Sequence, residues 1–151
     1  MTAIAQDFKT VERNRMKVQW QHDQRFLELT MSAPTKGWVA IGFNELDELK
    51  DAYLIMGAVR NGKVNVEEHY VFASGDYRSF EEIKFSSHLS GISGDEGQSG
   101  TNISFKLPAD MMTKYTKLLS EGATFYLIMA FSQEDDFRHH SVMRTSIKIK
   151  L

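Results

Sequence analysis

Cysteine is absent from this chain, and its absence excludes a whole set of chemistries. Without a thiol the protein can form no disulfide, hold no cysteine-ligated zinc or iron–sulfur cluster, attach no c-type haem covalently and use no thiol nucleophile. The lack of cysteine does not assign a cellular compartment, because exported proteins can also be free of it. Fold and function must therefore be sought in the other residue types.

The sequence also lacks an excess charge of one sign, a long apolar run and a known catalytic motif. Its 18 Lys and Arg against 20 Asp and Glu leave a net charge of -2, so nucleic acid is not an expected partner. The longest apolar run, Phe125 to Phe131, falls far short of the roughly 20 residues that cross a bilayer. No nucleophile elbow and no glycine-rich phosphate loop is present. We therefore expect neither a transmembrane segment nor enzymatic activity from the isolated domain.

Short apolar or alternating runs bounded by turn residues recur along the chain, which is typical of an all-β protein. Met16 to Trp20 and Phe26 to Met31 alternate between apolar and polar residues, as strands with one buried face do. Trp38 to Phe43 and Tyr53 to Val59 are apolar on both faces, as expected for central strands of a sandwich. Further strands are predicted at 64–72, 101–107, 125–131 and 146–151.

Turn and helix signals separate these strands. Asn61-Gly62 is the strongest hairpin signal, because both positions of a type I′ turn favour positive φ. The stretch 73–100, rich in Ser, Gly and Asp, predicts a long loop-dominated region. Pro108 begins the only helical pattern, which ends at Gly122. Residues 1–151 are thus predicted to form a single all-β sandwich domain with one short helix.

One tryptophan bears on the kind of ligand, and one short motif near the N-terminus bears on the cellular location of the protein. Trp38 is expected to pack between the sheets, whereas an exposed tryptophan would favour sugar stacking. Ala3-Ile4-Ala5 has the small-x-small pattern of a signal-peptidase site. We interpret the chain as an exported mature form, periplasmic or secreted, while a chance occurrence of this pattern in a cytoplasmic protein stays open.

Several segments of the sequence resemble the DOMON domain family. The resemblance covers nearly the whole chain and is most specific at its first block. It implies an immunoglobulin-like β-sandwich of about ten antiparallel strands, usually exported, that binds haem b or a sugar and often stands beside redox domains. The similar segments are Ser32 to Phe43, Asp51 to Met56, Asn61 to Val64, Glu68 to Tyr70, Phe125 to Phe131 and His140 to Arg144.

The resemblance also implies which residues would hold a haem. In haem-binding members the histidine ligand lies in the segment that corresponds to 137–144, where His140 is the best match and His139 the next. Both could equally be solvated residues of a charged loop. The expected position of a methionine ligand falls near Leu49, which cannot bind iron. The nearest methionine is Met56, which is either a second ligand or core filler.

Arg144 is the remaining candidate for cofactor binding. It could pair with a haem propionate or a sugar acid, and alternatively it could neutralise Asp135 or Asp136. The acidic residues of this loop match no named calcium or zinc site, so no metal-ion site is expected.

Two functions follow as hypotheses. The first is an exported domain that binds haem b for electron transfer, with a redox protein as its possible partner. The alternative is a cofactor-free carbohydrate- or protein-binding module that uses loops at one end of the sandwich. The alternative predicts exposed aromatic residues near those loops, among them Tyr53, Tyr77 and Phe137.

Overall fold

The computed structural model describes residues 8–151, and these form eleven β-strands. The expected export signal at Ala3-Ile4-Ala5 lies outside the described residues. The strands are β1 (Lys9–Arg13), β2 (Met16–Asp23), β3 (Phe26–Ala33), β4 (Val39–Asn44), β5 (Tyr53–Arg60), β6 (Lys63–Ala73), β7 (Asp76–Ser79), β8 (Ser90–Gly97), β9 (Gly100–Pro108), β10 (Thr124–Phe131) and β11 (Met143–Lys150).

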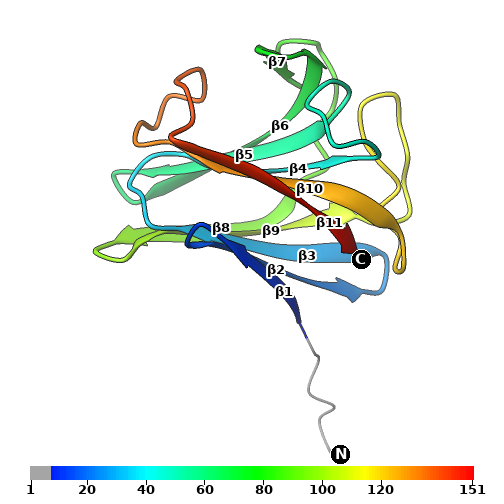
Figure 1. Cartoon of the computed structure of the whole chain (residues 1–151), viewed down its shortest axis with the longest axis horizontal. Helices are drawn as coiled ribbons and strands as arrows, with labels where there is room; N and C mark the ends of the chain where they lie inside the picture. The colour runs from blue at the N-terminus through cyan, green and yellow to red at the C-terminus, as the bar shows by residue number, and fades with distance from the viewer. Residues whose placement is uncertain (1–7) are drawn as a thin grey trace, which may run out of the picture.

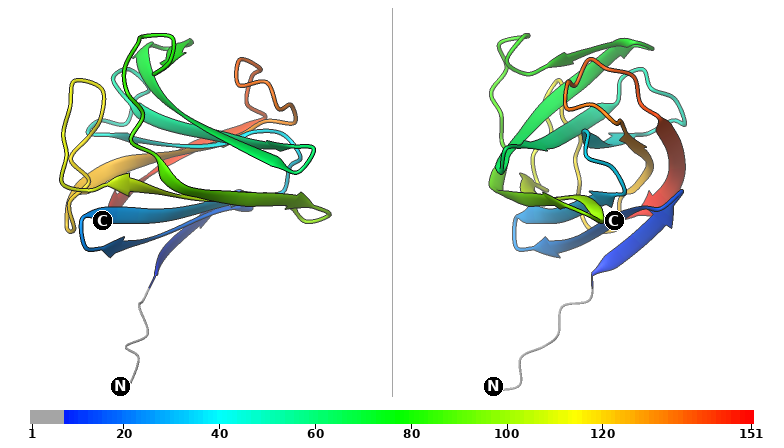
Figure 2. Two further views of the ribbon diagram at one scale, coloured as in Figure 1. Left: turned by 180° about the vertical axis from the view of Figure 1, so that it is seen from behind. Right: turned by 90° about the vertical axis from the view of Figure 1, so that its left-hand side faces the viewer.

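Two antiparallel sheets pack face to face, which confirms the predicted all-β sandwich (Figure 1). The five-stranded sheet has the order β1-β2-β3-β9-β8, and the six-stranded sheet has the order β11-β10-β4-β5-β6-β7. Views from behind and from the side show the same two layers, with β7 at the outer edge of the six-stranded sheet (Figure 2). The strands number eleven, close to the ten that were expected.

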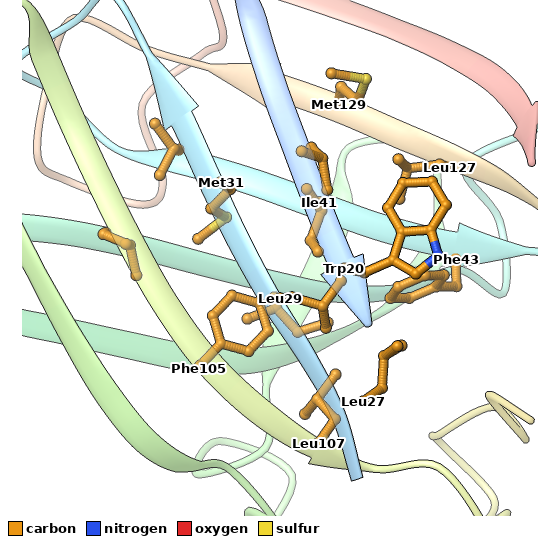
Figure 3. Close-up of a cluster of buried hydrophobic side chains, with 14 of the residues drawn as sticks. Trp20, Leu27, Leu29, Met31, Ile41, Phe43, Phe105, Leu107, Leu127 and Met129 are labelled. Carbon is orange, nitrogen blue, oxygen red and sulfur yellow. The ribbon is translucent and has the colours of Figure 1, made fainter. Parts of the chain in front are cut away.

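The hydrophobic core lies between the facing sides of the two sheets. Alternation along each strand directs Trp20, Leu29 and Phe105 of the five-stranded sheet toward Ile41 and Leu127 of the six-stranded sheet (Figure 3). All five side chains are buried. Each contributes about 1.5–3 kcal/mol when it leaves water, so this layer of contacts holds the sandwich together.

Strands β4 and β5 are buried on both faces, as their sequences predict. Every residue of β4 and all but the last of β5 are buried. Ile41 and Ile55 point into the core, whereas Ala40 and Met56 belong to a second cluster on the outer face of the sheet. Trp38 belongs to this outer cluster, because it shares the parity of Ala40. The prediction that Trp38 packs between the sheets is wrong, although its side chain is buried.

The short helix expected after Pro108 does not form, and that prediction is wrong. Pro108 is the last residue of β9, and the connection to β10 has no regular structure. The hydroxyls of Thr113 and Thr116 accept hydrogen bonds from nearby main-chain N–H groups and so compete with helical pairing. Leu119 packs into the core while Met112 is exposed, so the apolar residues form no common face. The described chain contains no helix of the length and apolarity that crossing a bilayer requires.

The stretch 73–100 is more regular than its composition predicts. It contributes β7, which pairs with β6, and β8, which pairs with β9. Both are edge strands, and every residue of β8 is exposed. A strand without a buried face shows no alternation of apolar residues, so the sequence pattern could not reveal it.

Candidate functional site

The outer face of the six-stranded sheet carries a row of residues that are neighbours across four strands. Strand pairing aligns Met56 of β5 with Ala40 of β4, and Ala40 with Ala130 of β10. Ala130 is in turn paired with Arg144 of β11. Because the two alanines are short, the sheet is hollowed between Met56 and Arg144. These two residues are three strand spacings apart, or about 14 Å.

Two loops stand at opposite ends of this hollowed face (Figure 1). The Leu49 loop (residues 45–52) connects β4 to β5, and the histidine loop (residues 132–142) connects β10 to β11. The view from behind shows the same separation, with the orange histidine loop far from the turquoise Leu49 loop (Figure 2). Strand β4 runs from the histidine loop toward the Leu49 loop, because its first residue, Val39, pairs with Phe131.

A pocket of about 200 Å³ lies between the two loops. A neighbouring hollow of about 600 Å³ shares Leu49, Ile128 and Arg144 with it, so the two adjoin. Small and aliphatic side chains line the floor of the pocket, and polar side chains line its rim. The lining residues are Trp38, Ala40, Leu49, Leu54, Met56, Val71, Gly75, Tyr77, Ile128, Ala130, Arg138, His139, His140, Ser141 and Arg144.

Hydrogen bonds to the main chain fix the part of the histidine loop that carries the two histidines. Trp38 Nε1 donates to the carbonyl of His139 at 3.2 Å, and Ser132 Oγ donates to the carbonyl of His140 at 2.9 Å. Both histidines are exposed, and neither imidazole forms a hydrogen bond with residues 8–151. The backbone is thus held in place while the ring nitrogens are free to bind a ligand.

The histidine loop is fastened at its beginning by a close approach of two main chains. Thr35 Oγ1 donates to the carbonyl of Ser132 at 2.5 Å, and the Trp38 N–H donates to the carbonyl of Glu134 at 2.9 Å. A Cβ atom on Gly37 would overlap the main chain at Ser132 and Glu134, so this position requires glycine. The Gly-Trp pair that opens the apolar strand therefore positions the histidine loop.

A third histidine, His69 of β6, is buried against two aromatic rings beside the pocket. Its ring centroid lies 5.8 Å from that of Tyr77 and 5.9 Å from that of Phe137, and both contacts are edge-on. The Tyr77 hydroxyl donates to the Phe137 carbonyl, which joins β7 to the histidine loop. Burial lowers the pKa of His69 to about 4, and burial also raises the pKa of Tyr77. Both side chains are therefore uncharged at neutral pH.

The rim of the pocket is cationic. Two arginines and two histidines line the pocket, and no carboxylate does. Arg138 is paired with Glu82 at 2.7 Å, whereas Arg144 has no ion-pair partner among residues 8–151. In the described chain no group of three or more histidine and acidic side chains is arranged to hold a metal ion. The pocket thus suits a ligand with an apolar body and acidic groups at its edge.

The structure places all four residues that were predicted to bind a cofactor around this one pocket. His139, His140 and Arg144 lie at the rim and are exposed. Met56 lies in the floor and is only 3 % exposed. Leu49, the expected position of a methionine ligand, lies on the loop at the opposite end.

Sequence reasoning did not identify the floor and the far wall of the pocket. The floor depends on Ala40 and Ala130, and the far wall on Leu54, Val71 and Tyr77. A signal was available, because β4 and β5 are apolar on both faces although a two-layer sandwich buries only one face of each sheet. The second apolar face indicated that something else covers it.

The fold is a two-sheet β-sandwich with a hollowed outer face, and the sequence identifies its family. The DOMON domain family matches residues 12–132, so the chain belongs to that family. The matched region contains Leu49 and Met56 and ends before His139. No curated protein matches the chain.

The solved structures that share the fold include two cytochrome domains. The first is the cytochrome b domain of pyranose dehydrogenase from Coprinopsis cinerea, with a TM-score of 0.72 and 10% sequence identity. The second is the cytochrome domain of cellobiose dehydrogenase from Myriococcum thermophilum, with a TM-score of 0.67 and 7% identity. In both cases the similarity covers 95% of this chain and 81% of the other. At this identity the likeness establishes the architecture.

Proposed function

We propose that this chain is a haem b-binding module that carries single electrons. The observation that supports it best is the pocket on the outer face. Its floor is apolar, its rim offers two unbonded imidazoles and an unpaired arginine, and its lining contains no carboxylate. A flat apolar ligand with two carboxylates and a metal that accepts imidazole meets each of these features. The two solved structures described above are cytochrome domains, which agrees with the proposal.

The residues present fit such a group in chemistry and in space. Imidazole is a common axial ligand of haem iron, and arginine forms forked hydrogen bonds with carboxylates. Pockets for small molecules usually measure about 300–1,000 Å³. The inner pocket of about 200 Å³ is below that range, but the adjoining hollow adds about 600 Å³. A ligand larger than the inner pocket would also occupy the adjoining hollow, which Asp47, Glu48 and Lys50 line beside Leu49 and Arg144.

Each predicted residue has a role in this proposal. His140 would bind the iron, with His139 as the substitute, since both histidines line the pocket. Arg144 binds a propionate. Met56, in the floor, would contact the ligand either as a second ligand of the iron or as part of the apolar packing. The bound haem supplies a reversible one-electron couple.

The protein would affect the haem in two ways, by excluding water from the pocket and by holding the histidine loop in position. Leu54, Val71 and Ile128 exclude water from the floor and the far wall, and a dry surrounding shifts the reduction potential. The hydrogen bonds from Trp38 and Ser132 would hold the main chain of His139 and His140 in place when the haem is bound. We further propose that the protein is exported and that its electron partner is a redox enzyme, as in the two dehydrogenases that contain its structural neighbours.

The alternative of a carbohydrate-binding module has less support. It predicted exposed aromatic residues near the loops, but Tyr53 is buried with 2 % exposure and stacks on Phe80. Tyr77 and Phe137 are half-buried and pack on His69. None of the three is the fully exposed aromatic residue that this alternative predicted.

Titration of the purified protein with hemin tests the proposal. We expect a sharp Soret band at one equivalent, and we expect His140→Ala to change it more than His139→Ala does. Arg144→Gln should weaken binding, whereas Arg78→Gln should not, because Arg78 pairs with Asp76 outside the pocket. A Soret band that survives unchanged in the double variant His139→Ala/His140→Ala would refute the proposed site.

A further inference from the structure

We propose that a second hollow on the outer face binds a primary ammonium group at the end of an aliphatic chain, such as that of a diamine or of a lysine side chain. This acidic hollow measures about 310 Å³ and adjoins the pocket described above, with which it shares Tyr77 and Arg138. Binding there would not require haem. Strand β6 contributes Asn65, Glu67 and His69 to its lining, and the histidine loop contributes Asp135, Asp136 and Phe137.

The charge of the acidic hollow is opposite to that of the neighbouring pocket. Its lining carries four carboxylates, on Glu67, Glu82, Asp135 and Asp136, and one guanidinium, on Arg138. With its histidine uncharged, the lining therefore has a net charge of -3. The guanidinium is already paired with Glu82 at 2.7 Å. The hollow thus favours a cationic ligand.

His69 presents an unpaired acceptor to the acidic hollow. Its side chain is only 4 % exposed, and because burial lowers its pKa to about 4, the ring is uncharged at neutral pH. Nδ1 lies 3.4 Å from the carbonyl of Glu67, so the ring proton belongs on Nδ1 and Nε2 carries the lone pair. Nε2 faces Glu67 Oε2 at 3.7 Å. Two acceptors therefore face one another, and a donor bound in the hollow would serve both.

Asp135 brings a second unpaired acceptor from the histidine loop. Its Oδ1 is buried and has no hydrogen-bond partner among residues 8–151. Its Oδ2 lies 3.7 Å from Nε of Arg60, which is beyond hydrogen-bonding distance, and Arg60 is 75 % exposed. A buried acceptor without a donor is costly. Strand β6 and the histidine loop, which lie far apart in the sequence, thus each direct an acceptor without a donor at the same hollow.

An ammonium group suits these acceptors because it combines a positive charge with three N–H donors and has no acceptor of its own. Its hydrogen bonds to carboxylates would be stronger than those between neutral groups. Tyr77 and Phe137 are half-buried in the same lining, so their carbon atoms can pack on an aliphatic chain. The Tyr77 hydroxyl already donates to the Phe137 carbonyl. A metal ion fits less well, since no group of three histidine and acidic side chains among residues 8–151 is arranged to hold one.

Titration calorimetry of the protein without hemin tests the proposal. Putrescine should bind at one equivalent, whereas butanediol, which has the same chain but no charge, should not bind. Tetramethylammonium has the charge but no N–H donor, so it should bind roughly tenfold more weakly than putrescine. Absence of putrescine binding would overturn the proposal, and so would equal binding of putrescine and tetramethylammonium.

A lysine derivative distinguishes the two sources of the ammonium group. N-acetyl-lysine methylamide presents the same group on a lysine side chain. If it binds as tightly as putrescine does, the hollow receives a lysine of a partner chain. If it binds at least tenfold more weakly, the hollow is a site for a free diamine.

Three variants locate the binding site. Asp135→Asn removes the charge of one acceptor and His69→Phe removes the other, and each should weaken putrescine binding roughly tenfold. Asp110→Asn is the matched control, because Asp110 pairs with Arg25 outside the hollow and the variant loses the same charge. Asp135→Asn decides the matter, since this side chain is 25 % exposed and its amide has the same shape. If it binds putrescine as tightly as Asp110→Asn does, the acidic hollow does not hold the ammonium group.

Discussion

Acidification should destabilise the apo-protein through His69, and the size of the effect can be worked out. Burial lowers the pKa of this imidazole from its ordinary value of 6.5 to about 4. The unfolded chain therefore takes up a proton between these two values that the folded protein does not. The contribution of His69 to stability is fully present above pH 6.5 and is lost as the pH falls toward 4.

The magnitude follows from the shift of the pKa. Each unit corresponds to about 1.36 kcal/mol, so the full loss across the window is about 3 kcal/mol. Between pH 7 and pH 5 the expected loss is about 2 kcal/mol, because the unfolded imidazole is only partly protonated near pH 6.5. A loss of this size is a large share of the 5–15 kcal/mol that holds a typical domain together.

The total pH dependence of the wild type would not isolate His69, since buried Glu68 acts with the opposite sign. Burial raises the pKa of Glu68, although the Tyr53 hydroxyl donates to its carboxylate at 2.8 Å. The folded state therefore holds this proton more tightly than the unfolded state does. The contribution of Glu68 is present below the unfolded pKa of 4.5 and is lost as the pH rises through the folded value.

Comparison of variants isolates the effect of His69. His69→Phe keeps the edge-on packing against Tyr77 and Phe137 but removes the titration. Urea unfolding of both proteins at pH 7 and pH 5 should show a difference in stability loss of about 2 kcal/mol. The matched control is Tyr77→Phe, which loses the hydrogen bond to Phe137 and should cost about 1 kcal/mol equally at both pH values. Parallel curves for wild type and His69→Phe would refute the reasoning.

Three further predictions concern the pocket itself. Gly37→Ala should destabilise the protein by about 1–3 kcal/mol in urea unfolding and reduce hemin binding, because the added Cβ displaces the histidine loop. Gly97→Ala, where nothing lies within 4 Å of the added Cβ, is the neutral control. Arg144→Gln should weaken hemin binding by about 1.5–3 kcal/mol, because it removes a charged hydrogen-bond donor. Titration with hemin at several salt concentrations measures this loss. If the binding of the variant depends on salt as strongly as that of the wild type, Arg144 does not contact a propionate. Ala40→Leu should fill the floor and abolish hemin binding while thermal unfolding stays cooperative; undiminished binding would place the ligand elsewhere.

Local patterns were sufficient where a physical constraint acts within a few residues. The hairpin at Asn61-Gly62 is confirmed, because both residues adopt positive φ, at 52° and 75°. The alternating strands are also found near their predicted positions, since alternation reports directly on which face is buried. These signals need no knowledge of the rest of the chain.

The prediction of a helix after Pro108 was wrong because local hydrogen bonds compete with the helical pattern. Apolar spacing favoured a helix, but Thr113 and Thr116 offered their hydroxyls to the same main-chain groups. Tyr115 was then free to pack on Phe85 and Tyr70, with centroids 5.0 Å apart in both pairs. Tertiary contacts outweighed a spacing that a short segment alone could not enforce.

The position of the candidate site could be predicted in part from the sequence, because the most apolar strands of the chain form its floor. Strands β4 and β5 bury both faces, yet only one face of their sheet meets the other sheet. The second face is covered by Trp38 and by the histidine loop, and it leaves a hollow where Ala40 and Ala130 are too short to fill the space. Ala40, Met56 and Ala130 of this face are at most 7 % exposed, so the chain itself already excludes most water from it. The proposed haem would extend that burial toward the rim, where the two unbonded imidazoles lie, and hemin titration of the histidine variants tests it.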